Sequence, residues 1–274
     1  MMEKGCGVME QSCHRNAKRF YGFAEVYDQN RPAMPQKACD LILSYLDAPP
    51  RHIVDLGSGT GLSAAAWQGA GASVIGVEPS GDMLAVARKR AGERLTFLQA
   101  YADRTGLADG FADAVVCSQS FHWMAPAATL LEVNRILRPG GVFAAVDCDW
   151  PPVMDWQVEK AYETLHRRVR QLEQELPDIK KTFTRWAKEE HLQHIRESGY
   201  FRYAREIVFD SEEPCDARRL IGLSQSQGGL QALLKSHPEA VEAVCGQFAE
   251  TVRRVYGDRR FLVRFCYRMR IGVK

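Results

Sequence analysis

Several features that often identify a function are missing from this sequence. Its eight cysteines form no Cys-x-x-Cys pair, which argues against a zinc ribbon or a thioredoxin-like centre. No apolar run reaches the ~18 residues of a membrane span, and residues 1–19 are polar and lack the apolar core of a secretory signal. The formal net charge of +2 offers no basic excess for nucleic acid or a membrane surface. We therefore expect a cytoplasmic protein without a nucleic-acid or membrane partner.

The cysteines themselves are scattered along the chain. Cys117 and Cys148 lie in apolar runs, which indicates buried, reduced thiols. Cys6 and Cys13 lie in a polar stretch, where a thiol role toward a metalloid is an open alternative. No cluster has the spacing of a metal site, so we expect none.

Short apolar runs alternate with helical patterns from residue 51 to about 147. The predicted strands cover residues 52–56, 72–78, 95–100, 112–118 and 142–146. Between them we expect helices over 61–69, 79–91, with Ser80 as its N-cap, and 127–137. Continuous apolar strands separated by helices are typical of a parallel sheet covered on both faces, and right-handed crossovers make such a sheet doubly wound.

The pattern changes after Pro151-Pro152. We expect amphipathic helices over 158–176 and 182–198, a mostly helical stretch over 214–256, and strands over 200–209 and 261–273. The predicted fold class is α/β: a doubly wound, seven-stranded, mostly parallel, Rossmann-like sheet with an antiparallel last strand and a helical insertion. The predicted parts are an N-terminal lid with helices (1–46), a cofactor-binding core (47–150), and a helical cap with the C-terminal strands (151–274).

A glycine-rich loop follows the first predicted strand. It reads Asp55-Leu56-Gly57-Ser58-Gly59-Thr60-Gly61. Glycine tolerates positive φ and lets the backbone approach a ligand closely. The loop lies at the carboxyl end of a strand, where doubly wound sheets bind ligands, and Glu78 at the end of the second strand could accept both hydroxyls of a ribose.

The spacing of the glycines favours one of two nucleoside cofactors. A nicotinamide loop of the form G-x-G-x-x-G needs glycine at position 62, where this chain has Leu62. S-adenosylmethionine has no pyrophosphate, so it does not need the helix N-terminus as an anion site. Asp55 could help hold its ammonium group and would repel a diphosphate. The loop therefore predicts S-adenosylmethionine.

Several motifs resemble those of class I methyltransferases of the methyltransferase type 11 group. Residues 54–61, 77–80, 102–103 with 109–113, and 137–141 are similar to that group's loop, second-strand, adenine and pre-fifth-strand motifs. Tyr27, Arg31, Pro32 and Pro35 resemble the lid of its trans-aconitate methyltransferase-like members, and residues 118–123 resemble their His-Trp motif.

The resemblance implies a set of cofactor-binding residues. They are Tyr27, Arg31, Asp55, Gly57, Ser58, Gly59, Gly61, Glu78, Pro79, Met83, Ala102, Asp103, Ser118 and Gln119. In this set Glu78 would bind the ribose hydroxyls, while Met83 and Asp103 would hold the adenine. Arg31 would pair with the carboxylate of the cofactor.

The residues that would act on the methyl acceptor are less well defined. His122 is the candidate general base, and its alternative role is a hydrogen-bonded histidine that shapes the pocket. Arg264, Arg268 and Arg270 share one face of the last strand, where they would either hold an anionic substrate or form a solvated surface. The helix over 158–176 is expected to be a cap or a homodimer surface.

The function expected from these patterns is methyl transfer from S-adenosylmethionine to a small-molecule acceptor, either a carboxylate or another O or N nucleophile. A protein that binds the cofactor without transferring the methyl group is the alternative from another class. A nicotinamide-dependent dehydrogenase is the less favoured enzyme, because Leu62 argues against it.

Overall fold

The computed structural model describes residue 16, residues 22–180 and residues 184–274. Its centre is a seven-stranded sheet in the order β3-β2-β1-β4-β5-β7-β6. The strands are β1 His52–Leu56, β2 Ser73–Val77, β3 Leu95–Leu98, β4 Ala112–Ser118, β5 Leu137–Cys148, β6 Tyr203–Cys215 and β7 Phe261–Val273. The first five strands in this order, β3, β2, β1, β4 and β5, are parallel to one another. Strand β7 is antiparallel to both β5 and β6. The predicted fold class is confirmed.

Both faces of the parallel part of the sheet are buried. On β4, Val115 and Val116 are fully buried but belong to different apolar clusters, because successive side chains of a strand point to opposite faces. Phe143 and Ala144 repeat this division on β5. The continuous apolar runs of the sequence therefore reflect a sheet covered on two sides.

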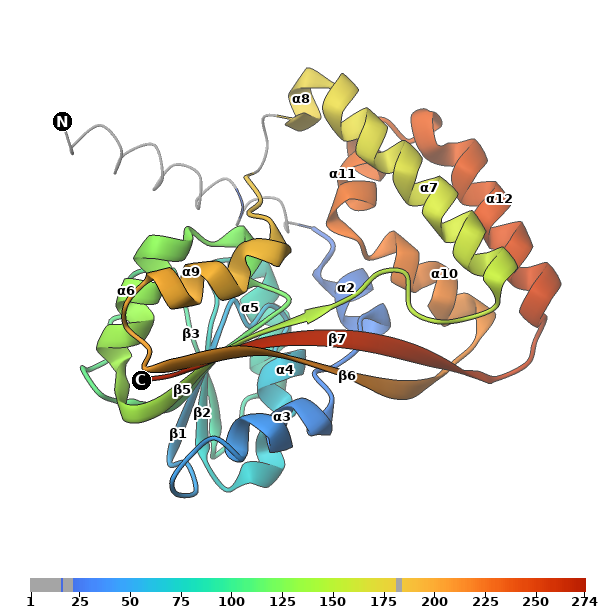
Figure 1. Ribbon diagram of the computed structural model, residues 1–274. Coiled ribbons are helices and arrows are strands. Elements are labelled where there is room, and N and C mark those ends of the chain that lie inside the picture. The colour runs from blue at the N-terminus through green and yellow to red at the C-terminus, as the bar shows by residue number, and fades with distance from the viewer. Residues whose placement is uncertain (1–15, 17–21, 181–183) are drawn as a thin grey trace.

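Helices cover the sheet and form a helical bundle beside it (Figure 1). They are α2 Ala24–Asn30, α3 Gln36–Leu43, α4 Leu62–Ala65, α5 Gly81–Ala87, α6 Pro126–Ile136, α7 Trp156–Glu175, α8 Pro177–Lys180, α9 His191–Glu197, α10 Ala217–Gln225, α11 Gly228–Ser236 and α12 Glu239–Tyr256, with short 3₁₀ turns η1 Gln68–Ala70, η2 Arg88–Arg90, η3 Phe121–Trp123 and η4 Lys188–Glu190. The predicted N-cap is confirmed, since Ser80 Oγ accepts a hydrogen bond from the backbone N–H of Met83 at 3.4 Å.

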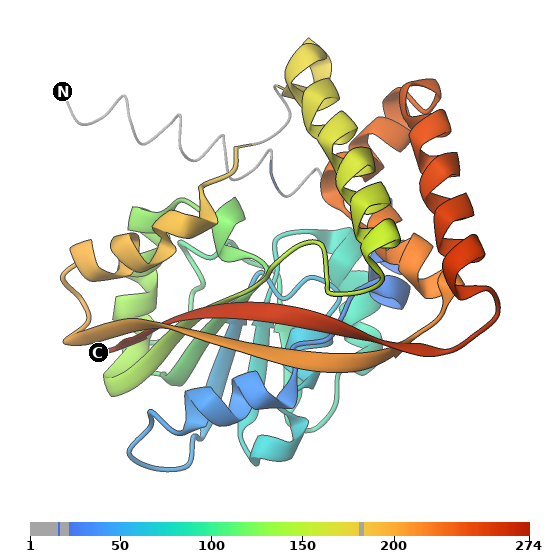
Figure 2. The ribbon, with the colours of Figure 1, turned by 45° about the vertical axis from the view of Figure 1, so that its right-hand side comes forward.

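The long strands β6 and β7 extend past the rest of the sheet and reach a bundle of α7, α10, α11 and α12 (Figures 1 and 2). Val158, Tyr162, Leu165 and Val169 of α7 are buried at helical spacing in the core of this bundle, as the sequence pattern predicts. In β7 the predicted period-two alternation holds from Val263 to Arg268, with Phe265 among the fully buried residues, but from Met269 to Val273 both faces are buried. Within the described residues, none of the helices has the length and apolarity that crossing a bilayer requires.

The helix predicted over 182–198 is wrong in its first half. Residues 184–187 form no helix, and regular structure begins only at η4 and continues into α9. The backbone N–H of Trp186 instead donates to the carbonyl oxygen of His122 at 2.9 Å. This hydrogen bond holds the segment against the loop after β4.

Four of the six described cysteines are buried, and Cys245 and Cys266 are half-buried. Cys117 and Cys148 are both free and buried. Burial raises the pKa of the Cys148 thiol to about 12, which keeps it protonated and unreactive. Cys6 and Cys13 lie outside the described residues.

Candidate cofactor and acceptor site

The glycine loop turns tightly after β1. The backbone N–H groups of Gly57 and Ser58 donate to the carbonyl oxygen of Val77 at 2.8 and 3.1 Å, which ties the loop to the end of β2. Gly57 has a φ of 68°, and a Cβ there would lie 2.7 Å from Met124 Cε and from Ser120 Cβ. The position therefore requires glycine for its backbone conformation and for its space.

Glu78 connects this loop to the helix that follows β2. Its Oε2 accepts a hydrogen bond from the N–H of Gly59 at 3.0 Å, and its Oε1 accepts one from the N–H of Ser80 at 2.9 Å. Burial raises the pKa of Glu78 to about 7. Each oxygen keeps a lone pair, so the carboxylate can hold the loop and still accept hydrogen bonds from a ligand.

A cavity of about 1020 Å³ opens beside the loop. Of the fourteen predicted cofactor residues, eleven line it, and so does His122. The eleven are Tyr27, Arg31, Gly57, Gly59, Glu78, Pro79, Met83, Ala102, Asp103, Ser118 and Gln119. The fold thus brings together residues that are more than ninety positions apart in the sequence. That these residues bind the cofactor remains a prediction.

The other three predicted residues, Asp55, Ser58 and Gly61, do not line this cavity. The Asp55 carboxylate is fully buried, and its Oδ2 accepts a hydrogen bond from Ser63 Oγ at 2.8 Å. Burial raises the pKa of Asp55 to about 7. The Asp55 side chain hydrogen-bonds to the first turn of α4, while Gly61 is the N-cap of that helix and Ser58 is buried. The contact of Asp55 with the methionine ammonium stays a prediction.

Arg31 lies where α2, the segment after β5 and the start of α11 meet. Its guanidinium carbon is 5.1 Å from the ring centre of Tyr27 and 5.0 Å from that of Trp150. Nη2 donates to Gln227 Oε1 at 3.3 Å, whereas Nε and Nη1 have no hydrogen-bond partner among the described residues. Arg31 therefore presents a positioned cation with unused donors at the wall of the cavity.

Gln119, just after β4, has a left-handed backbone. Its φ is 57°, an uncommon value for a residue with a side chain. The N–H donates to the carbonyl oxygen of Val146 at 2.8 Å, and Oε1 accepts a hydrogen bond from Lys188 Nζ at 3.3 Å. Strain of this kind persists where surrounding contacts hold it, and often at functional sites.

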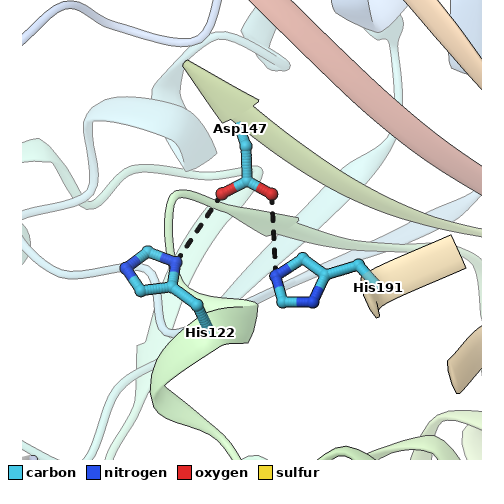
Figure 3. Close-up of side chains that lie close together, drawn as sticks. All are labelled: His122, Asp147 and His191. Carbon is cyan, nitrogen blue, oxygen red and sulfur yellow. Dashed lines mark ion pairs between the residues drawn. The ribbon is translucent and has the colours of Figure 1, made fainter. Parts of the chain in front are cut away.

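One buried carboxylate at the cavity has four basic side chains around it. Asp147, near the end of β5, is 2% exposed. Its Oδ1 lies 3.0 Å from Lys188 Nζ and 3.6 Å from His122 Nδ1, and its Oδ2 lies 3.1 Å from Arg270 Nη1 and 3.7 Å from His191 Nε2. Figure 3 shows the two imidazoles on either side of the carboxylate.

The charges in this cluster follow from its burial. Burial acts to raise the pKa of Asp147, but the Lys188 ammonium and the neighbouring imidazoles outweigh it, and the pKa is well below its usual value. Burial lowers the pKa of both His122 and His191 to about 4. At neutral pH the carboxylate is therefore ionised and both imidazoles are neutral.

Sequence reasoning missed Asp147, Lys188 and His191. The carboxylate could have been found, because it ends the fifth predicted strand, at the edge of the sheet where ligands bind. Lys188 was missed because the helix predicted over 182–198 is wrong in its first half. His191 carries no local signal, since its place depends on how α9 packs against Phe121.

The three arginines of β7 have different surroundings. Arg264 is exposed and pairs with Glu212, so at this position the prediction of a solvated face fits. Arg268 pairs with Asp149 at 3.0 Å, and Arg270, 3% exposed, pairs with Asp147; both line the cavity. Of the three arginines, only Arg268 and Arg270 therefore reach the cavity.

Comparison with known proteins identifies the domain that carries the glycine loop. A family model described as a methyltransferase domain matches residues 54–145. An uncharacterized methyltransferase of Mycobacterium tuberculosis is 37% identical over 115 residues, 42% of this chain and 46% of the relative. A demethylmenaquinone methyltransferase of Beutenbergia cavernae is 35% identical over 105 residues, 38% of this chain and 43% of the relative. The chain thus spans about half the length of the curated relatives it matches.

Solved structures show that the fold extends beyond the matched segment. A candidate type II methyltransferase from Anaeromyxobacter dehalogenans superimposes with a TM-score of 0.67 at 20% identity, covering 89% of this chain and 97% of that one. A candidate antibiotic-pathway methyltransferase from Anabaena variabilis gives a TM-score of 0.59 at 19% identity, over 87% and 98%. Residues 54–145 therefore match a methyltransferase domain, and most of the chain shares the fold of these solved structures.

Proposed function

We propose that this protein transfers a methyl group from S-adenosylmethionine to a small-molecule acceptor. The observation that carries the proposal is one continuous cavity with two chemically different walls. One wall is the glycine loop with Glu78 and Asp103, and the other holds His122 and Trp150. A cavity of about 1020 Å³ is at the upper end of the range for small-molecule sites, with room for a cofactor and a small acceptor.

The residues at the first wall fit the chemistry of this cofactor. Glu78 offers a buried carboxylate to a ribose diol, Asp103 an acceptor to an adenine amino group, and Arg31 two unused donors to a carboxylate. The cofactor, when bound, supplies an electrophilic methyl group on a sulfonium sulfur. The protein's part is to orient the two reactants, because correct placement supplies much of the rate enhancement of such a reaction.

We propose that the acceptor is a carboxylate or another O or N nucleophile, which binds in a cavity that combines Trp123 and Trp150 with charged side chains. We also propose the narrower relation to trans-aconitate methyltransferase-like proteins, which rests on the resemblance of Tyr27, Arg31 and residues 118–123.

Incubation with S-adenosylmethionine carrying a labelled methyl group and a panel of small carboxylates, alcohols, phenols and amines is the direct test. Appearance of label in an organic product, lost in Glu78→Gln and kept in Glu212→Gln, would support the proposal. Tight binding of S-adenosylhomocysteine without labelling of any compound, in the panel or in a metabolite extract, would favour a cofactor-binding protein instead.

A further inference from the structure

The residues of the Asp147 cluster come from five elements of the fold. His122 comes from η3, Asp147 from β5, Lys188 from η4 and Arg270 from β7, with His191 at the start of α9. His122, Asp147, Lys188 and Arg270 line the cavity, whereas His191 is fully buried behind them. Burying a carboxylate and its charged partners carries a large desolvation penalty, so a functional role for Asp147 toward His122 is worth testing.

A metal ion is one reading of this cluster, and the positions of the cations argue against it. The ligand atoms of His122, Asp147 and His191 lie within 4.8 Å of one another, a spacing that could hold an ion. Both carboxylate oxygens, however, already face cations: Lys188 Nζ at 3.0 Å and Arg270 Nη1 at 3.1 Å. A divalent ion would lie beside two positive charges in a poorly solvated site, where their repulsion is strong.

The orientation of the His122 ring suggests a different role. Its Nδ1 faces Asp147 Oδ1 at 3.6 Å and is enclosed by protein, while Nε2 is on the side of the ring away from the carboxylate (Figure 3). This distance is longer than a hydrogen bond, and catalytic hydrogen bonds commonly shorten when substrate binds. A proton on Nδ1 would leave the lone pair on Nε2.

We propose that Asp147 is a positioning residue that holds His122 as the Nδ1–H tautomer, so that Nε2 takes the proton from the methyl acceptor. The inference rests on the proposed methyl transfer, and it narrows the acceptor class. A carboxylate is already ionised and needs no base. The site is instead suited to an acceptor that carries a proton on its nucleophilic atom, such as an alcohol, a phenol or an N–H group.

The proton transfer balances within this site. The acceptor atom gives its proton to His122 Nε2, and its electron pair forms the bond to the methyl carbon. The carbon–sulfur bond breaks, and its electron pair stays on sulfur. The resulting imidazolium is stabilised by the Asp147 charge and later releases its proton to solvent.

The surrounding charges set the protonation states that this role needs. The charged and titratable groups facing His122 are Asp147 from β5, Lys188 from η4 and Arg185 from the segment before it; His191 and Arg270 lie across the carboxylate. Lys188 and Arg270 keep Asp147 ionised. Burial lowers the pKa of His122 to about 4, so the imidazole is a neutral base at neutral pH.

Long-range ¹H–¹⁵N correlation spectra of the ¹⁵N-labelled protein test the tautomer directly, with His122→Gln to assign the signals. We expect a neutral Nδ1–H imidazole in the wild type. In Asp147→Leu, which is similar in size but leaves Nδ1 without an acceptor, the tautomer should change to Nε2–H. The matched variant Asp149→Leu, two residues along, should leave the His122 signals unchanged.

Two results would overturn the proposal: an Nε2–H or protonated His122 in the wild type, or an unchanged tautomer in Asp147→Leu. The first decides the matter even if the variant does not fold. Stoichiometric binding of Zn²⁺ that shifts both His122 and His191 would also overturn it in favour of a metal site.

Binding and turnover separate this inference from the methyl transfer on which it rests. Calorimetry with S-adenosylhomocysteine should give similar affinities for the wild type, His122→Gln and Asp147→Leu. Failure of the wild type to bind would sink the proposed function, whatever the tautomer. For protic acceptors methylated by the wild type, His122→Gln should lower kcat by about 10²–10⁴-fold, and an unchanged kcat would contradict a base.

Discussion

The carboxylate of Glu78 accepts a hydrogen bond from the backbone N–H of Gly59 at 3.0 Å, so the acid at the end of the second strand holds the glycine loop after the first. This bond joins the two most recognisable features of the sequence into one wall of the cavity. The bond also gives a reason for the glycine loop and Glu78 to occur together, since Glu78 contacts the backbone of the loop as well as the cavity.

Glu78→Gln should weaken cofactor binding while leaving the fold intact. The amide is isosteric with the acid but loses the charge and one acceptor, and hydrogen bonds to a charged group contribute about 1.5–3 kcal/mol. The Kd for S-adenosylhomocysteine should therefore rise roughly 10- to 100-fold in calorimetry. Glu212→Gln, which removes an exposed partner of Arg264, is the control and should bind like the wild type. Equal affinities for the two variants would remove Glu78 from the binding site.

Gly57→Ala should destabilise the protein more than Gly199→Ala. Both positions have positive φ, 68° and 73°, so both variants incur the cost of a left-handed alanine, about 1–2 kcal/mol. Only at Gly57 would the new methyl group also meet Met124 and Ser120 at 2.7 Å, whereas nothing lies within 4 Å at Gly199. Urea unfolding of the two variants should differ by about 1–3 kcal/mol. Equal losses would show that the loop can relax away from its neighbours.

Arg31→Gln should discriminate between ligands with and without a carboxylate. If the unused donors of Arg31 bind the methionine carboxylate, the variant should lose affinity for S-adenosylhomocysteine by roughly 10-fold or more. Its affinity for methylthioadenosine, which lacks both the carboxylate and the ammonium, should hardly change. A similar loss for both ligands would instead assign Arg31 to the ordering of Tyr27 and Trp150, on whose rings it stacks.

Asp55→Asn should stabilise the protein increasingly as the pH rises. Burial raises the pKa of Asp55 to about 7, above its ordinary value of 3.8, so the folded chain binds the proton more tightly than the unfolded chain. The stability this gives is fully present below the unfolded pKa and is lost as the pH rises through about 7, at up to ~1.4 kcal/mol per pH unit. Urea unfolding of the wild type and variant at about pH 4, 5.5 and 8 measures the difference. A pH-independent difference would contradict the raised pKa.

The part of the cavity around the glycine loop could be predicted because its signals are local. The glycine loop and Glu78 each follow directly from a strand, and strand ends of a parallel sheet meet at one edge. Local signals did not say which way a side chain at the end of β1 points. The sequence therefore could not show that the Asp55 carboxylate hydrogen-bonds to Ser63.

The acceptor half was less accessible to sequence reasoning, because its contacts join distant segments. Asp147 contacts Lys188 and Arg270, which lie far from it in the sequence. The contact with Arg270 exists because β7 pairs antiparallel to β5. Alternation along β7 placed Arg268 and Arg270 on one face but could not show that this face becomes buried toward one end. The same alternation could not separate Arg264, which stays exposed.

Calorimetric titration of the full chain with S-adenosylhomocysteine, alongside a titration with NADH, tests the central claim most directly. The geometry of the Gly57–Glu78 wall predicts saturable binding of S-adenosylhomocysteine and no measurable binding of NADH. Binding of NADH in preference, or no heat with S-adenosylhomocysteine at any concentration, would contradict the assignment of this cavity.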